Sequence, residues 1–136
     1  MGISKHPRGW LARKMIAGAM VQVLKPTEEL AEAEYAALVE ISDLYRNDWA
    51  SRIKKRSNAK AADLPVGFVD TVDTYTSTSG TVNRYNIMKI TIKHHGKAKT
   101  LSCSYGENTR MNRTRNDALL MLLKRLKEFG YEKAAI

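Results

Sequence analysis

The feature that most constrains the fold is an alternating run between Tyr85 and Tyr105, broken once at His95 and Gly96. Successive side chains of a strand point to opposite faces, so this period predicts two strands that share one buried face. A residue that tolerates positive φ, followed by glycine, suits a tight hairpin turn. The sequence therefore predicts an antiparallel β-hairpin over residues 85–105. Its inward residues are Met88, Ile90, Ile92, Leu101, Cys103 and Tyr105.

A helical period precedes the hairpin. Thr27 is a good N-cap, and Glu28 and Glu29 follow in the first turn, where the helix dipole favours negative charge. The pattern predicts a helix over residues 27–56. Apolar residues recur in it three and four positions apart, at Leu30, Ala33, Ala37, Leu38, Ile41, Leu44, Tyr45 and Trp49.

Two further elements complete the second half of the chain. β-branched and aromatic residues between Val66 and Thr76 predict another strand. Thr114, with Asp117 three positions later, predicts the capped start of a last helix, which Gly130 ends. The apolar stripe of this helix is Leu119, Leu122, Leu123, Leu126 and Phe129.

Residues 9–24 are predicted to be helical as well, since apolar residues recur at helical spacing until Pro26. The predicted fold is therefore α+β, in the order α-α-β-β-β-α, with a three-stranded antiparallel sheet packed against helices. Residues 1–26 would form a basic N-terminal arm or helix, and residues 27–136 a single α+β domain. No internal repeat is apparent in the sequence.

Length and composition limit the class of protein. The 136 residues suit one domain, and 43% hydrophobic residues argue against a disordered chain. The single cysteine excludes an internal disulfide framework. The apolar stretch from Met15 to Leu24 is shorter than the about 20 residues that span a bilayer. We therefore expect no membrane segment and an intracellular protein, either cytoplasmic or associated with the nucleoid or nucleus.

The charge is strongly positive and unevenly distributed. The chain has 23 Lys+Arg and 14 Asp+Glu, which gives a net charge of +9. Residues 27–50 are acidic, whereas residues 84–116 carry eight bases and one acid. This balance favours an acidic partner, of which nucleic acid is the commonest.

Three basic segments are candidates for contact with phosphate. Arg110, Arg113 and Arg115 lead into the predicted last helix, whose N-terminal N–H groups also attract anions. The second segment is the predicted hairpin, and the third is the end of the helix at 27–56. Each has a purely structural alternative: the arginines could be solvated, the hairpin lysines could protect a sheet edge, and bases are favoured at a helix C-terminus. The predicted contacts are Arg84, Lys89, Lys93, Lys97, Lys99, Arg110, Arg113, Arg115, Lys54, Lys55 and Arg56.

The order helix, three strands, helix over residues 27–130 resembles the double-stranded RNA-binding domain. The likeness rests on the strand at 85–92, the turn at 95–97 and the basic start of the last helix, Arg113-Thr114-Arg115. It implies that Arg113 and Arg115 contact phosphates across the major groove, with Asn83 or Arg84 in a minor groove. The chain departs from this family after residue 115, where Asn116-Asp117 replaces the usual lysine cluster.

The C-terminal half is also similar to the three-strand-plus-helix DNA-binding domain of phage-type integrases and plant ethylene-response factors. In those domains the exposed face of the sheet reads the major groove. This resemblance implies that Lys89, Thr91 and Lys93, on the outward face of the predicted hairpin, contact the nucleic acid.

Metal binding and catalysis find little support in the sequence. The histidines and Cys103 lack the spacing of a structural zinc site. Asp70 and Asp73, three positions apart on a predicted strand, would fall on opposite faces and share no Mg²⁺. We therefore expect no metal, no cofactor and no enzymatic activity.

Two function classes remain open. The first is a non-enzymatic protein that binds nucleic acid, RNA or DNA, with a duplex favoured. The second is a small protein-binding module or inhibitor, for instance encoded by a virus or phage. It would dock on a host protein or nucleic-acid enzyme through the acidic helix at 27–50, with Tyr35 or Trp49 exposed. The same helix is a candidate homodimer face.

Overall fold

The computed structural model describes residues 2–54, 64–106 and 113–131. The order of elements is β-β-β-α-β-β-β-α, with two three-stranded antiparallel sheets. The α+β class is as predicted, but the predicted order with one sheet is wrong. The difference arises in the first 25 residues, which form strands instead of a helix.

The first sheet consists of β1 (Ile3–His6), β2 (Gly9–Ile16) and β3 (Ala19–Lys25) in the order β1-β2-β3. Ala17 and Gly18 join β2 to β3 with φ angles of 45° and 89°, as a tight hairpin turn requires. Ala19, Val21 and Val23 are buried at every second position of β3. The period is thus two, and the helix predicted at 9–24 is wrong.

A long helix packs on the first sheet. α1 (Glu28–Leu44) continues through a π-helical turn, η1 (Tyr45–Trp49), into α2 (Ala50–Arg52). The predicted N-cap is confirmed, since Thr27 Oγ1 accepts from the N–H of Leu30 at 3.3 Å. The helix ends at Arg52 instead of continuing to the predicted 56, because Ile53 is extended and pairs with Ile92 of the second sheet.

The second sheet consists of β4 (Val69–Thr76), β5 (Val82–His94) and β6 (Lys97–Tyr105) in the order β4-β5-β6. The predicted hairpin is confirmed, and its turn residues His95 and Gly96 have φ angles of 51° and 79°. The predicted inward residues are all buried.

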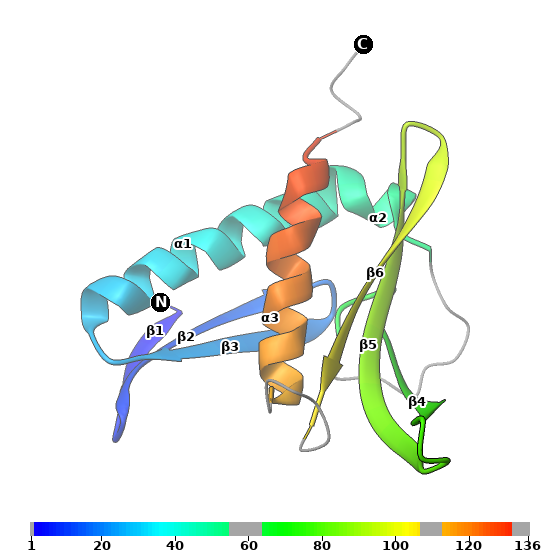
Figure 1. Cartoon of the computed structure of the whole chain (residues 1–136). Helices are drawn as coiled ribbons and strands as arrows, with labels where there is room; N and C mark the ends of the chain where they lie inside the picture. Colours follow the sequence, from blue (N-terminus) through cyan, green and yellow to red (C-terminus); the bar gives the residue numbers. More distant parts are fainter. Residues whose placement is uncertain (1, 55–63, 107–112, 132–136) are drawn as a thin grey trace.

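The last helix covers the inner face of the second sheet. α3 (Arg115–Leu126) ends in a 3₁₀ turn, η2 (Lys127–Phe129), and lies against β5 and β6 (Figure 1). Thr114 accepts from the N–H of Asp117, whose carboxylate accepts from the N–H of Thr114. The predicted capping box is confirmed.

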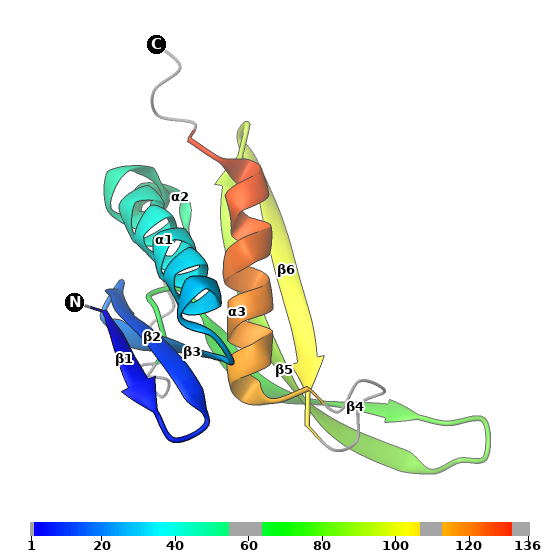
Figure 2. The same ribbon diagram turned by 90° about the vertical axis from the view of Figure 1, so that its left-hand side faces the viewer.

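The two helices lie next to each other between the sheets (Figure 2). Lys124 of α3 bonds to Glu34 of α1 at 3.1 Å, and Lys127 of η2 pairs with Glu40 at 3.0 Å. A single cluster of buried residues extends from Val21 in β3 through α1 to β5, β6 and α3. Each sheet is therefore backed by a helix, and the two halves share one core.

Candidate nucleic-acid interface

The outer face of the second sheet carries lysines and hydroxyl groups. Lys89, Thr91 and Lys93 alternate along β5 with three buried residues that face α3, so their side chains point away from that helix. Thr100 and Ser102 are opposite Thr91 and Lys89 in the ladder and share this face. The hydroxyl oxygens of Thr91 and Thr100 are 2.9 Å apart. The face predicted for β5 is thus present.

A third lysine joins this face from a distant segment. Ile53 forms a β-bridge with Ile92, and the N–H of Lys54 donates to the carbonyl of Thr91 at 2.9 Å. Ile53 and Ile92 are both buried, so the next pair, Lys54 and Thr91, lies on the outer side. We call this surface the basic sheet face, defined by Lys54, Lys89, Thr91, Lys93, Thr100 and Ser102.

The charge of the basic sheet face is not neutralised by acids of the described residues. Lys54, Lys89 and Lys93 have no ion-pair partner within residues 2–54, 64–106 and 113–131. β4 carries one carboxylate on the outer face, that of Asp73. Val69 is opposite Lys89, and Asp73 is four residues farther along β4. At about 3.3 Å per residue this is roughly 13 Å along the strand. The face therefore presents an anion-attracting surface.

The other predicted lysines and Arg84 lie on the opposite side of the strands. Lys99 is opposite Ile92, and Lys97 is opposite His94. Both side chains therefore lie on the inner face of the sheet, the face that α3 covers at other positions. Arg84 is opposite Thr74, also at an inner position, where the ribbon extends past the helix. The ladder thus divides the predicted row between two faces.

The two arginines at the start of α3 make contacts within the protein. Arg113 Nη1 donates to the carbonyl of Ser104 and to Cys103 Sγ, both at 3.2 Å. Arg115 Nε donates to Asp70 Oδ2 at 2.7 Å. Their guanidinium groups therefore help to hold α3 on the second sheet. Arg110, Lys55 and Arg56 lie outside the described residues.

Asp70 also accepts a hydrogen bond from the hydroxyl of Tyr105, at 2.6 Å. Burial raises the pKa of Tyr105 to about 12, and the hydrogen bond to the Asp70 carboxylate contributes to this rise. The cluster of Asp70, Tyr105 and Arg115 connects β4, β6 and α3. The sequence does not indicate that Asp70 is a partner of these residues, because its contacts come from residues 35 and 45 positions away.

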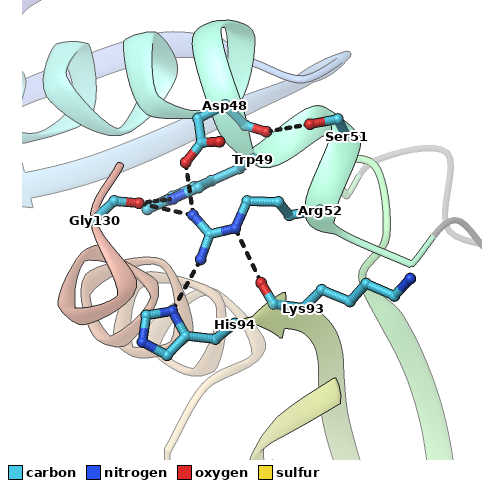
Figure 3. A network of polar contacts seen from close by, with 7 residues as sticks. All are labelled: Asp48, Trp49, Ser51, Arg52, Lys93, His94 and Gly130. Carbon is cyan, nitrogen blue, oxygen red and sulfur yellow. Dashed lines mark hydrogen bonds and ion pairs between the residues drawn. The ribbon is translucent and has the colours of Figure 1, made fainter. Parts of the chain in front are cut away.

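Trp49, an expected contact for a protein partner, is fully buried and donates from Nε1 to the carbonyl of Gly130 at 3.0 Å. The prediction that it is exposed is wrong. Beside it lies Arg52, near the end of the helix that carries Trp49 (Figure 3). Arg52 bonds to Asp48 at 2.6 Å and to the carbonyls of Lys93 and Gly130. It is a structural residue, 8% exposed.

His94, which also contacts Arg52, acts as a hydrogen-bond acceptor. Nδ1 of His94 is 3.1 Å from Nη2 of Arg52, which has only donors to offer. Its ring also packs edge-on against Phe129. Among the described residues, no group of three His, Cys, Asp or Glu side chains is arranged to hold a metal ion.

Two findings concern the chain as a whole. Within the described ranges, no helix has both the length and the apolar character needed to cross a bilayer. No protein-family model, curated protein or solved structure matches this chain.

Proposed function

We propose that the protein binds a nucleic-acid duplex through the basic sheet face, without catalysing a reaction. The observation that carries the proposal is the convergence of Lys54, Lys89 and Lys93, from two separate segments, on one sheet face. None of the three is neutralised by a described carboxylate. In this role the protein acts inside the cell, where duplexes are found.

The shape of the surface supports a B-form DNA duplex as the partner. Three strands spaced about 4.8 Å apart are roughly 10 Å wide, and the major groove of B-DNA is about 12 Å wide. The lysines would neutralise phosphates, while hydroxyl groups such as those of Thr91 and Thr100 can bond to base edges. The major groove of an RNA duplex is too deep and narrow for such readout.

The contacts of the arginines favour this face over the start of α3. The likeness to the double-stranded RNA-binding domain would use Arg113 and Arg115, which here bond to β6 and β4. The likeness to the integrase and ethylene-response-factor domains uses the exposed sheet. Lys89, Thr91 and Lys93 remain available for the second mode of binding.

A pair of matched double variants tests the proposal. Lys89→Gln/Lys93→Gln removes two charges from the basic sheet face, whereas Lys97→Gln/Lys99→Gln removes two from the opposite side of the same hairpin. Fluorescence anisotropy with labelled DNA duplex, RNA duplex and single strands would be measured at two salt concentrations. We expect the first variant to bind the DNA duplex about tenfold more weakly, with a salt slope reduced by about 2. The second variant should retain most of the affinity.

Two outcomes would contradict the proposal. One is a lack of binding to every nucleic acid at low salt. The other is an equal loss of affinity in both double variants, which would show that overall charge rather than this face determines binding. In the first case, partners captured from a nuclease-treated lysate would favour the protein-binding module instead.

A further inference from the structure

The ribbon formed by β4 and the first half of β5 leaves apolar side chains in water. It extends beyond the helices (Figure 2), and β4 is exposed from Thr71 to Thr76. Val72, Tyr75 and Val82 are 58%, 52% and 64% exposed. A two-stranded ribbon is marginally stable in water without further strands or a covering layer. Additional pairing along β4 would stabilise it.

β4 is an edge strand in the described part of the chain, with β5 as its one neighbour. The N–H of Thr74 donates to the carboxylate of Asp73 at 2.9 Å instead of to β5. Because backbone groups alternate between the two sides of a strand, Val72 also directs its N–H and C=O to the open edge. Apart from the N–H of Thr74, the edge therefore offers its backbone donors and acceptors to another strand.

We infer that β4 pairs antiparallel with β4 of a second copy of this chain, about a two-fold axis at Val72. In this register the two Val72 residues face each other as a hydrogen-bonded pair, and Tyr75 is opposite Val69 of the other copy. The pairing gives exposed Val72 and Tyr75 apolar neighbours from the second chain. Two three-stranded sheets become one continuous six-stranded sheet.

The charges on β4 are compatible with this register and exclude an axis at Asp73. An axis at Val72 places Asp73 opposite Thr71, and Asp70 opposite Thr74, so each carboxylate meets a hydroxyl group. An axis at Asp73 would place two carboxylates directly opposite each other, at the short Cα separation of about 4.5 Å. An axis between two neighbouring residues would place the inner-face residues of one β4 opposite the outer-face residues of the other. A self-complementary contact of this kind is what a two-fold dimer requires.

Cross-linking with engineered cysteines tests the register. Hydrogen-bonded antiparallel pairs have Cα atoms about 5.5 Å apart, within the range of a disulfide. We expect Val72→Cys to form a covalent dimer under mild oxidation, read on a non-reducing gel. Thr76→Cys is the control: it lies on the same face, but its copies would be eight positions apart, roughly 27 Å. The native Cys103 is buried. Equal cross-linking of both variants would overturn the inference.

Light scattering coupled to gel filtration tests the dimer itself. The wild-type protein is expected at twice the chain mass. Val72→Pro removes an edge-facing N–H at the axis and spares the ladder to β5, so this variant is expected as a monomer with retained circular dichroism. A monomeric wild-type protein at about 100 μM, or a folded Val72→Pro variant that remains dimeric, would refute the pairing. Should the proline variant unfold, the cross-linking result decides.

Discussion

Asp70 determines what one of the candidate contacts, Arg115, does in the folded protein. It accepts from Arg115 at 2.7 Å and from the hydroxyl of Tyr105 at 2.6 Å. A guanidinium that is already paired with a carboxylate attracts phosphate less than an unpaired one. The residue type alone therefore overstates the ability of Arg115 to bind nucleic acid, whereas the lysines of the basic sheet face keep their charge uncompensated by described acids.

The raised pKa of Tyr105 predicts a pH-dependent effect of Tyr105→Phe. Below pH 10 the tyrosine is protonated in both states and its bond to Asp70 contributes fully. Between pH 10 and about 12 the unfolded chain releases the proton first, so this contribution falls as pH rises. We expect the variant to be less stable by about 1.5–3 kcal/mol at pH 7, with a smaller deficit at pH 11.

Urea denaturation of both proteins at pH 7, 9 and 11 measures this difference. Tyr131→Phe is the matched control, because Tyr131 is half exposed and its hydroxyl has no bond among the described residues. Its effect on the free energy of unfolding should be near zero at each pH. A deficit for Tyr105→Phe that does not change with pH would contradict the assignment.

At the scale of elements, the sequence predicts the second hairpin correctly and the first incorrectly. Polar residues on the outer face of β5 make the alternation with Met88 and Ile90 visible. In the first sheet both faces are rich in apolar residues, since Met15 and Met20 are exposed on one face while Ile16 and Ala19 are buried on the other. With both faces apolar, the period of two is hidden and helical spacings arise by coincidence.

Substitutions in the turn between β2 and β3 test the strand assignment, because their effects on stability have opposite signs in a hairpin turn and in a helix. Gly18 has a φ of 89° with open space around it, and Ala17 has a φ of 45°. Ala17→Asn should stabilise the hairpin by about 0.5–1 kcal/mol, and Gly18→Ala should destabilise it by roughly 1 kcal/mol. In a helix the two changes would have the opposite signs. Thermal denaturation of both variants checks this, and reversed signs would contradict the strand assignment.

The candidate site is predictable only where it lies within one element. The alternation of β5 suffices to place Lys89, Thr91 and Lys93 on one face. Lys54 joins them through a bridge between residues 39 positions apart, Ile53 and Ile92, which local periodicity does not encode. Pairings of this range depend on the packing of whole elements. The sequence therefore predicts the chemistry of the face but not its full extent.

At the scale of the molecule, the order of three strands followed by a helix occurs twice, although the sequence shows no repeat. The two halves are not independent, because buried residues connect β3, α1 and the second sheet in one cluster. The charge blocks contribute as well, since acids of α1 pair with lysines of α3 and η2. One cooperative unfolding transition is expected for such a shared core.

Arg52 is a buried polar link between the halves, and its replacement gives the strongest predicted effect on stability. It joins α2 to Asp48, to the end of β5 and to Gly130 beyond η2. Arg52→Met leaves the 2% exposed Asp48 without this partner, so we expect a loss of about 3–5 kcal/mol in urea denaturation. Asp48→Leu/Arg52→Met removes the buried carboxylate too and should be more stable than the single variant. Arg46→Met, which breaks an exposed ion pair with Asp43, should cost under about 1 kcal/mol. Similar losses for Arg52→Met and Arg46→Met would contradict the prediction, because they would mean that the buried pair contributes no more than an exposed one.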